Sequence, residues 1–486
     1  MNVEKPKRAC TRAPTDYNIL WNGLNWFEIE LVVSKLQSRI AKAVERGRYN
    51  LAKKLQYLLT NSFYAKLLAV KRVTTNKGKR TPGIDTELWT TSAKKYEAAL
   101  SLTKKNYKPS PLKRTYINKA NSKKKRPLGI PTMYDRAMQA LYLLCLDPVS
   151  ETVLDSRSFG FRKYRSTKDA GKYLFNILCQ KTAPKWILEG DIKSCFDKIS
   201  HAWLQENIFM DKDILKKFLK SGYVYHNQLF KTLSGTVQGG IISPTYANLT
   251  LNGLGDLLRK KYWRTLTGLI RKIANKRKVH IVIYADDFVV TSDSKETLAE
   301  IRTMIEEFLL ERGLELSEEK TVITHIDEGF DFLGWNFRKY NNKLIVMPSQ
   351  NSVKKVKVKL KEIVRVHIGH KQHLLIIRLN QIITGWCNYH KHVCAKKAFS
   401  DIDHYINQLL RKWAIRRHPN KSFKWRKDRY FVRIEHRDWI FKSETNRLKF
   451  AASFKIKRHP LIRLNVNPYF PEHREYYLKR RFANSG

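Results

Sequence analysis

The chain has 486 residues, carries 94 Lys and Arg against 43 Asp and Glu, and has a formal net charge of +51. Its length exceeds what one ordinary hydrophobic core supports, and its 42% hydrophobic content argues against a disordered chain, so we expect several packed units. Self-repulsion at this charge favours a polyanionic partner such as nucleic acid over a basic surface kept for solubility, which needs a net charge of only about 2 to 8.

The sequence also disfavours membrane-spanning, secreted and zinc-binding classes of protein. No apolar run approaches the roughly 20 residues needed to span a bilayer, and the N-terminal region contains no apolar core of a signal peptide. The cysteines form no C-x-x-C pair; they are Cys10, Cys145, Cys179, Cys195, Cys387 and Cys394. This scatter fits neither a disulfide framework nor a zinc site. We expect a soluble, non-secreted protein whose reduced thiols lie mostly in the core.

The N-terminal part of the chain is predicted to be a loose tail followed by helices. Residues 1 to about 20 are polar, basic and interrupted by proline. From residue 26 to about residue 71, apolar residues recur at helical spacing with Lys and Arg around them. One apolar stripe consists of Ile29, Val33, Leu36 and Ile40. Gly and Pro in the segment NKGKRTPGID, residues 76–85, end this helical region.

A basic segment that contains aromatic residues comes next. Residues 104–131 surround Tyr107 and Tyr116 with Lys and Arg. Aromatic side chains among cations suit a strand that stacks bases and tracks phosphates. A charged loop would have a similar composition, so both interpretations stay open.

Two strand patterns in the middle of the chain carry acidic residues. WILEGD predicts a strand that runs from Trp186 into Asp191, and VHIVIYADDFVV predicts strand, tight turn and strand with Asp286 and Asp287 at the bend. Two aspartates in a hairpin turn are often turn chemistry alone. Here the flanking Ile, Val and Phe residues indicate buried strands. The acids would then lie at the edge of a hydrophobic sheet.

These three carboxylates would form one oxygen-rich site if the two strand patterns are neighbours in the sheet. Such a site suits Mg²⁺ rather than zinc. Two Mg²⁺ ions about 3.5 to 4 Å apart support phosphoryl transfer, because one activates the attacking oxygen and the other stabilises the leaving oxygen. In-line attack of this kind depends on positioning and charge stabilisation. It needs no side-chain nucleophile, and the sequence shows no serine or cysteine triad.

The C-terminal part of the chain is predicted to be helical and then irregular. Three successive apolar stripes predict a small helical domain. The stripes are Val353, Val356, Leu360 and Ile363; then Leu375, Leu379, Ile382, Trp386 and Tyr389; then Phe399, Ile402, Ile406, Leu409 and Trp413. From about residue 424 the sequence is basic, aromatic and irregular.

Eight sequence blocks in order resemble the group II intron-encoded reverse transcriptases and maturases. They are TPGID (81–85), RPLGIPTMYDRAMQ (126–139), SFGFRKYRST (158–167), EGDIKSCFDKISH (189–201), VQGGIISPTYANLTLN (237–252), YADD (284–287), LELSEEKT (314–321) and GFDFLGW (329–335). YADD alone is a weak pattern, whereas the ordered set is highly specific. The resemblance implies an α+β right-hand polymerase fold with fingers and palm built on antiparallel sheet, an α-helical thumb called domain X, and a small basic C-terminal domain.

The same resemblance divides the chain into four parts. Residues 1–75 would be an N-terminal extension with a tail and a helical RNA-binding segment, 76–338 the fingers and palm, 339–423 the thumb, and 424–486 a basic DNA-binding-like region. Longer family members continue into an H-N-H nuclease with cysteine pairs. No such cysteines occur here, so we expect no endonuclease, although a shortened chain would look the same. Retrohoming would then need nicked or replicating DNA, or another nuclease.

The resemblance also implies roles for residues of a catalytic centre. Asp191, Asp286 and Asp287 match the family's catalytic Mg²⁺-binding triad, and the backbone of Ile192 would line the same site. Phe196 matches an aromatic gate that excludes a ribose 2′-hydroxyl, with an ordinary core aromatic as the rival interpretation.

Nucleotide-binding residues follow from other blocks. Lys119 and Arg126 match positions that neutralise the incoming triphosphate, although Lys119, Lys124 and Lys125 are hard to separate. The loop of Gln238, Gly239 and Gly240 would pack against the templating pair, since glycine allows close approach. Lys320 matches a lysine that could protonate or neutralise pyrophosphate, with a solvated helix-end lysine as the rival.

Basic residues outside this centre are expected to contact nucleic acid. They are Arg162, Lys354, Lys355, Lys357, Arg411, Lys412, Arg416 and Arg417. The thumb lysines could hold intron RNA or the template duplex, with a solvated basic face as the rival. Such binding should weaken steeply with salt, and RNA shape should dominate recognition.

These expectations describe an RNA-directed DNA polymerase that is also a maturase. It would bind its group II intron RNA, assist splicing and copy that RNA into DNA during retrohoming, using an RNA template with a DNA primer, target DNA and dNTPs. Neither a membrane nor zinc is expected, and the location would be a bacterial cytoplasm or nucleoid, or an organelle matrix. A splicing-only maturase is disfavoured by the intact acids, since drift would remove charges that have no task. The block KWAIRRHPNKS (412–422) resembles the family's thumb, and together with the length of the thumb it disfavours a retron or antiphage lineage.

Overall fold

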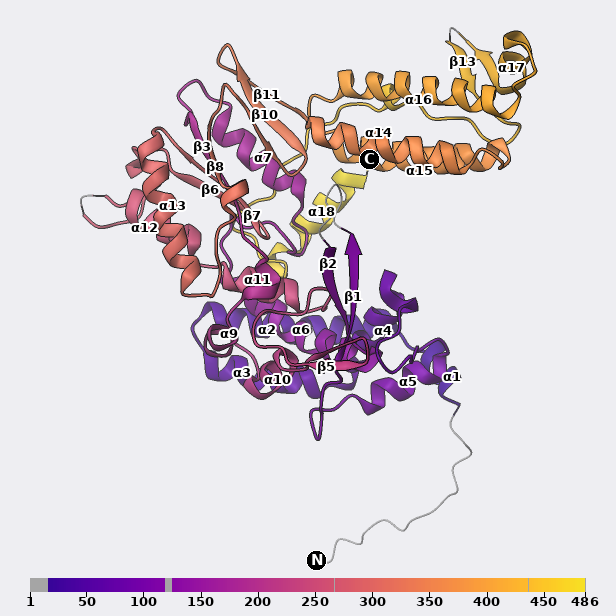
Figure 1. Ribbon diagram of the computed structural model, residues 1–486. Helices are drawn as coiled ribbons and strands as arrows, with labels where there is room; N and C mark the ends of the chain where they lie inside the picture. Colours follow the sequence, from indigo (N-terminus) through magenta and orange to yellow (C-terminus); the bar gives the residue numbers. More distant parts are fainter. Residues whose placement is uncertain (1–15, 119–124, 266, 436, 486) are drawn as a thin grey trace, which may run out of the picture.

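The computed structural model describes residues 16–118, 125–265, 267–435 and 437–485. These residues form a right-hand polymerase fold, in which N-terminal helices lie beside the fingers hairpin, a palm sheet lies next to them, and a long helical thumb extends away (Figure 1). Within the described ranges, every helix is too short or too polar to span a bilayer.

The N-terminal helices begin with α1 (Tyr17–Asn22), α2 (Trp26–Glu45), α3 (Tyr49–Asn61) and α4 (Phe63–Thr75), followed by α5 (Ser92–Ser101) and α6 (Met133–Val153). The sequence predicts this region as helical, and turns divide it into separate helices. Asn25 caps α2 by accepting a hydrogen bond from the backbone of Glu28. Of the predicted stripe, Ile29, Val33 and Ile40 are buried. Helices α2 and α4 pack against α6, which is buried along most of its length.

The fingers contain a mixed sheet with the strand order β2-β1-β4-β5. The strands are β1 (Leu112–Asn118), β2 (Lys125–Ile130), β4 (Tyr223–Tyr225) and β5 (Gln228–Phe230). Strand β1 pairs with β2 in antiparallel fashion, as expected for the fingers, and also pairs in parallel with β4 at Leu112 and Lys113. Tyr107 is buried and donates a hydrogen bond to Asp135, and therefore cannot stack on a base, whereas Tyr116 is exposed.

The palm is an antiparallel sheet with the strand order β6-β7-β3-β8. The strands are β3 (Trp186–Asp191), β6 (His280–Tyr284), β7 (Asp287–Ser292) and β8 (Val322–His325). Alternate residues pack on opposite faces, as their spacing of two predicts. Ile187, Val282 and Val289 share a core with α7 (Thr167–Leu178). Leu188, Ile281 and Val290 share a second core with α13 (Lys295–Leu310).

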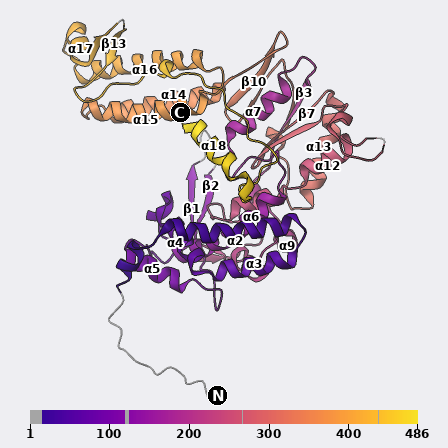
Figure 2. The same cartoon turned by 180° about the vertical axis from the view of Figure 1, so that it is seen from behind.

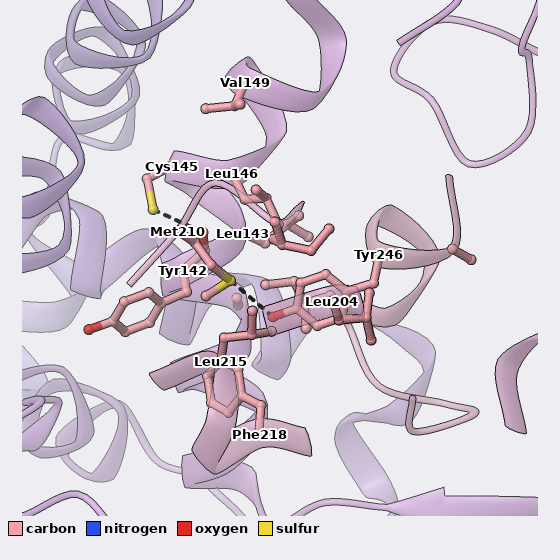
Figure 3. Close-up of a cluster of buried hydrophobic side chains, with 14 of the residues drawn as sticks. Tyr142, Leu143, Cys145, Leu146, Val149, Leu204, Met210, Leu215, Phe218 and Tyr246 are labelled. Atoms are coloured by element: carbon pink, nitrogen blue, oxygen red, sulfur yellow. Dashed lines mark hydrogen bonds between the residues drawn. The ribbon is translucent and has the colours of Figure 1, made fainter. Parts of the chain in front are cut away.

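Short helices join the palm to the N-terminal helices. They are α8 (Cys195–Lys198), α9 (His201–Asn207), α10 (Lys212–Leu219), α11 (Ser243–Thr250) and α12 (Leu254–Tyr262), with 3-10 turns η1 (Lys77–Arg80), η2 (Lys272–Ala274) and η3 (Glu318–Lys320). Figure 3 shows the shared core, where the Tyr246 hydroxyl donates to the Met210 sulfur at 3.2 Å. Cys145, Cys195 and Cys387 are buried, as expected, whereas Cys394 is exposed. Cys10 lies outside the described residues.

The thumb is the helical bundle that the three apolar stripes predict. A small sheet of β9 (Phe330–Phe332), β10 (Trp335–Tyr340) and β11 (Lys343–Pro348) leads into α14 (Gln350–Val366), α15 (Gln372–His390) and α16 (Lys396–Arg417). Leu360, Leu379 and Phe399 are fully buried in the bundle core. Trp335 donates to His390 at 3.1 Å and joins the small sheet to the thumb.

The C-terminal region, expected to be a small basic domain over 424–486, packs in two parts. Its first part, α17 (Phe423–Tyr430), β12 (Phe431–Ile434), β13 (Arg437–Phe441) and η4 (Ala451–Ser453), extends the thumb, because Tyr430, Phe431 and Phe441 belong to the thumb core. The remainder, with η5 (Pro471–His473) and α18 (Arg474–Ser485), runs back to the palm (Figure 2). Ile462, Val466 and Tyr477 join the core shared by the palm and α7.

Candidate active site

The three predicted carboxylates meet at one end of the palm sheet. Asp191 is the last residue of β3 and pairs directly with Asp287, the first residue of β7. Asp286 precedes it in the turn, next to Ala285, whose φ is +57°. Because β3 and β7 are neighbours, the condition that the sequence left open is met, and Asp191 lies beside the hairpin.

The segment around Gly160 packs directly against this turn. The Phe159 N–H donates to the Ile283 carbonyl at 2.8 Å. A Cβ on Gly160 would lie 2.3 Å from the Ala285 nitrogen, which no real contact allows. Glycine at this position therefore lets the backbone approach the turn that carries Asp286 and Asp287.

Burial and mutual repulsion perturb the acids. Burial, followed by the charges of Asp286 and Asp191, raises the pKa of Asp287 to about 7. Burial also raises the pKa of Asp286, against the attraction of Arg126 and Lys320. The Lys320 ammonium donates to Asp191 at 2.9 Å, and this hydrogen bond raises the pKa of Lys320. Like charges this close favour a cation between them.

The donor set suits a divalent cation. Within the described ranges, no three His, Cys, Asp or Glu side chains already enclose a position for a metal ion, and one Asp191 oxygen is bonded to Lys320 instead. The acids nevertheless offer carboxylate oxygens, the ligands that Mg²⁺ prefers. Two backbone hydrogen bonds flank Ile192: the Asp191 carbonyl accepts one, and the Lys193 N–H donates the other. The Ile192 carbonyl takes part in neither of them. A divalent ion therefore fits here once Lys320 releases Asp191.

A cavity of about 730 Å³ opens over these acids and brings together fingers, palm and thumb. Asp191, Asp287 and Lys320 line it from the palm and Arg126 from the fingers hairpin. Lys355 of α14 lines it from the thumb, so this lysine, predicted only as a nucleic-acid contact, lies at the centre itself. Arg126, Lys320 and Lys355 supply cations that could neutralise a triphosphate beside the carboxylates of the same cavity.

Phe196 and the loop of Gln238 and Gly239 do not line this cavity. Phe196 is partly buried, with its ring edge-on to Phe161 at 6.3 Å between centroids. Gly239 has a φ of +110°, and a Cβ there would lie 2.8 Å from a Leu128 methyl group, so this position requires glycine. The loop thus packs against the fingers strand β2, where Gly129 donates to the Gln238 carbonyl at 3.1 Å.

Several residues that were predicted to contact nucleic acid interact with other residues of the protein instead. The prediction for Arg162 is wrong, because its guanidinium is buried and pairs with Glu151 at 2.8 Å. Lys357 forms an ion pair with Asp401 at 2.7 Å. Three further predicted positions, Lys354, Lys412 and Arg416, are exposed. Lys119 and Lys124 lie outside the described residues.

Two more predicted thumb residues also have partners inside the thumb. Arg417 donates to the carbonyls of Ile368 and His370, and so closes the turn after α14. The guanidinium of Arg411 lies 4.2 Å from the ring centroid of Trp439. These contacts are tertiary, so the charge pattern alone does not reveal them.

Sequence reasoning missed Glu189. This residue lines the cavity, and burial, followed by the charge of Asp331, raises its pKa to about 7. Glu189 precedes Asp191 by two positions on β3, and residues two apart in a strand share a face. That spacing was the signal that could have identified it.

Comparisons with known proteins agree on one family. Residues 117–337 match the family model for reverse transcriptase (RNA-dependent DNA polymerase), 21–102 match the N-terminal domain of reverse transcriptase, and 353–431 match the group II intron maturase-specific domain. The chain is similar to the group II intron-encoded protein LtrA of Lactococcus lactis subsp. cremoris, with 32% identity over 421 residues, 69% of either chain.

Two further similarities are weaker. The chain is 30% identical to the protein YkfC of Escherichia coli over 344 residues, which are 63% of this chain and 88% of that protein. Among solved structures, an apo telomerase from Candida tropicalis aligns with a TM-score of 0.36 and 16% identity over 49% of this chain and 55% of that chain.

Proposed function

The chain belongs to the group II intron-encoded reverse transcriptases and maturases, and from that premise we propose that Asp191, Asp286 and Asp287 form its polymerase centre around two Mg²⁺ ions. It is an RNA-directed DNA polymerase that also assists the splicing of its intron RNA, a combination suited to copying that RNA into DNA during retrohoming. Proteins of this family generally use divalent metal ions.

One observation carries the proposal. Asp191 and Asp287 stand opposite each other in the sheet register and line a cavity together with Arg126, Lys320 and Lys355, and Asp286 precedes Asp287 in the turn. When bound, the metal ions would supply activation of the attacking hydroxyl and stabilisation of the leaving oxygen. In-line attack of a primer 3′-hydroxyl on a dNTP requires carboxylates that hold metal ions close to cations that hold the phosphates.

The residues of this chain position the reactants. Arg126 would hold phosphate oxygens from the fingers side, and Lys320 can turn from Asp191 to the triphosphate when that carboxylate binds metal. Lys119 is proposed as a second phosphate contact. Phe196 would exclude the ribose 2′-hydroxyl, and the Gln238–Gly239 loop would pack near the templating pair.

The wider partners follow from charge and exposure. The exposed thumb residues Lys354, Lys412 and Arg416 would contact intron RNA or the template duplex, and the basic thumb tip at α17 would contact target DNA. The match to the maturase-specific domain argues against a retron or antiphage lineage. The protein would work where its intron RNA is made, beside the bacterial nucleoid or in an organelle matrix.

Primer extension on an RNA template with Mg²⁺ and dNTPs tests the centre. We expect Asp286→Asn to lower the extension rate at least about 100-fold, since each metal ligand supports several kcal/mol of charge stabilisation. Stimulation of intron splicing by the same variant is the control, because it reports a folded, RNA-binding protein. Unchanged extension by the variant would exclude this carboxylate from the centre.

A further inference from the structure

A turn at the edge of the palm exposes a group of apolar side chains. We call it the palm-edge turn; it covers residues 268–278, contains η2 and lies between α12 and β6. Leu269, Ile270 and Ile273 are 53%, 48% and 89% exposed, respectively. Single exposed apolar residues are ordinary on protein surfaces, whereas several together mark a surface that contacts a partner.

The same turn carries only positive charge of its own. Its charged residues are Arg271, Lys272, Lys276, Arg277 and Lys278, and residues 268–278 include no Asp or Glu. Arg277 is close enough to Glu296 and Glu300 of α13 to lower the pKa of both, but Glu300 already pairs with Lys261. The turn therefore keeps a strong positive charge, which favours a polyanionic partner.

Hydrogen bonds tie the turn to the palm. The Arg271 N–H donates to the Trp263 carbonyl at 2.8 Å, and the ring of the buried Trp263 donates to the Val279 carbonyl at 2.8 Å. The Asn275 side chain bonds the backbone of Val279 in both directions, at 2.9 and 2.8 Å. A surface that is already ordered loses little conformational entropy on binding, so more of its contact energy appears as affinity.

The palm-edge turn lies at the end of the sheet that is far from the catalytic acids. Strand β6 leaves the turn at His280, which pairs with Thr291, and reaches the acids at Tyr284, which pairs with Asp287. At about 3.3 Å per residue, β6 keeps the two about 13 Å or more apart. Helix α12, which precedes the turn, and α13 lie on the side of the palm opposite the thumb (Figure 1). A partner on the turn therefore leaves the catalytic cavity open to a duplex.

Bilayers and RNA are the two polyanionic surfaces that also accept apolar side chains. Peripheral proteins enter a bilayer with an amphipathic helix, and η2 has 3 residues, too few to form one. Unpaired RNA exposes flat base faces between its phosphates, and proteins recognise such bases in loops and bulges, whereas a duplex hides them. Cations precede and follow Ile273 in the turn. An apolar contact between cations fits unpaired RNA.

We infer that the palm-edge turn binds an unpaired segment of the intron RNA, away from the strand that is being copied. Ile270 and Ile273 cover the face of a base, and Arg271, Lys272 and Lys276 neutralise the flanking phosphates. The chain thereby holds its folded RNA at one end of the palm sheet while the other end carries the catalytic centre. This inference rests on the proposed function, because it takes intron RNA as the partner.

Binding of an RNA stem-loop to the full chain tests the inference. The probe is a fluorescent stem-loop with an adenosine-rich loop, added after excess unlabelled RNA–DNA duplex has filled the catalytic cavity. We expect Lys272→Gln combined with Lys276→Gln to weaken stem-loop binding about tenfold. The slope of log K against log salt should become shallower by about 1 to 1.5, because two fewer phosphates of a single strand are neutralised. Affinity for the matched uninterrupted RNA duplex should change less.

Lys216→Gln combined with Lys220→Gln is the matched control for charge. It removes the same charge from exposed positions at the end of α10, so it should change neither the stem-loop affinity nor the salt slope. Ile273→Ser tests the apolar contact and serves if the double Lys variant unfolds. It should weaken stem-loop binding about fivefold and leave the salt slope unchanged, since no charge is removed. Leu310→Ser, 72% exposed at the end of α13, is its control and should have no effect.

Unchanged stem-loop binding by both turn variants would overturn the inference, and so would equal losses of affinity for the stem-loop and the uninterrupted duplex. Co-sedimentation with vesicles of phosphatidylserine and phosphatidylcholine examines the other partner. Vesicle binding that depends on Ile273, without any loss of stem-loop binding in Ile273→Ser, would assign the turn to a bilayer instead. Asp286→Asn separates this inference from the proposed centre, because it should lose extension while keeping stem-loop binding that depends on the turn.

Discussion

At the scale of single residues, crowding of carboxylates decides how the candidate centre responds to pH. Asp287 lies against Asp191 across the sheet and next to Asp286 in the turn. Because its pKa rises from 3.8 to about 7, the metal-free folded chain binds this proton more tightly than the unfolded chain does. The contribution of Asp287 to the free energy of unfolding therefore falls as pH rises from about 4 to 7.

Magnesium should reverse this loss, and the effect is measurable as a melting temperature. We expect Mg²⁺ to raise Tm more at pH 8 than at pH 6, because a cation relieves the repulsion only when the carboxylates are ionised. Its apparent Kd should weaken about tenfold for each pH unit below 7. Asp287→Asn should remove the pH dependence. Equal Mg²⁺-induced shifts at both pH values would contradict the assignment.

Arg162 and Lys354 allow a buried cation that stabilises the fold to be compared with an exposed cation that binds RNA. Arg162 and Glu151 are both buried, and loss of one partner of a buried pair costs about 3 to 5 kcal/mol. We expect Arg162→Ala to lower the free energy of unfolding by that amount, as measured by urea titration, while RNA affinity of the folded fraction is kept. Lys354→Ala should do the reverse, leaving stability nearly unchanged and lowering both RNA affinity and its salt dependence. A stable Arg162→Ala protein that binds RNA weakly would restore the original prediction.

The role of a residue could be predicted from the sequence where its neighbours along the chain determine its surroundings. Asp286 and Asp287 stand in a turn between two buried strands, and spacing in β3 points to Glu189 as well. The sequence does not reveal that Arg162 is buried, because a basic residue in a basic chain looks the same whether Glu151 or a phosphate is its partner. Lys355 reaches the centre only because α14 begins beside the palm.

At the scale of elements, the hairpin of β6 and β7 is held by close backbone packing rather than by its own turn. Gly160→Ala places a methyl group where the Ala285 nitrogen lies. We expect this change to displace the acidic turn, lower kcat of primer extension by about tenfold or more, and cost about 1 to 3 kcal/mol of stability.

Gly385→Ala is the control for this change, because nothing lies within 4 Å of a Cβ there and the residue is in the middle of α15. It should stabilise the protein by up to about 1 kcal/mol, since alanine is the better helix former, and leave extension unchanged. Thermal melts and single-turnover extension of both variants make the comparison. Normal extension by Gly160→Ala would show that the turn tolerates the shift.

Periodicity predicted these elements well, and pairing between distant elements less well. Apolar alternation identified β3, β6 and β7, and spacing of three and four identified the thumb helices. Nothing in the sequence indicates that β1 pairs in parallel with β4, since the two strands are separated by more than a hundred residues and pair only at Leu112 and Lys113 of β1. Long-range pairing depends on the packing of the whole fingers region.

At the scale of the whole molecule, the C-terminal segment connects parts that are far apart in sequence. Asp169 of α7 accepts hydrogen bonds from the His459 ring at 3.0 Å and from the Ile462 N–H at 3.1 Å, and pairs with Arg480. Burial alone would raise the pKa of Asp169, but the His459 bond and the charge of Arg480 bring it below its usual value. The Tyr469 hydroxyl donates to Asp147 of α6.

The domain expected for residues 424–486 illustrates what composition cannot reveal. Lys and Arg dominate this region, and that composition is typical of a solvated DNA-binding surface. In the fold, its aromatic residues decide the outcome: Phe431 and Phe441 complete the thumb, and Tyr477 stacks on Tyr164 of the palm at 4.7 Å between ring centroids. The chain thus leaves the palm for the thumb and returns.

The return of the C-terminal segment should hold the thumb at a fixed place over the cavity. Arg480→Ala leaves the buried Asp169 carboxylate without the Arg480 cation. We therefore expect trypsin to cleave the segment beyond residue 455 faster than in the wild type. We also expect shorter DNA products per binding event, because a loosened thumb releases the duplex sooner. The rate of a single nucleotide addition should be unchanged, since the acids are untouched. Lys479→Ala, exposed on the same helix and paired with Glu475, should change neither quantity, as surface pairs contribute little. Equal product lengths for both variants would show that the segment is docked but does not restrain the thumb.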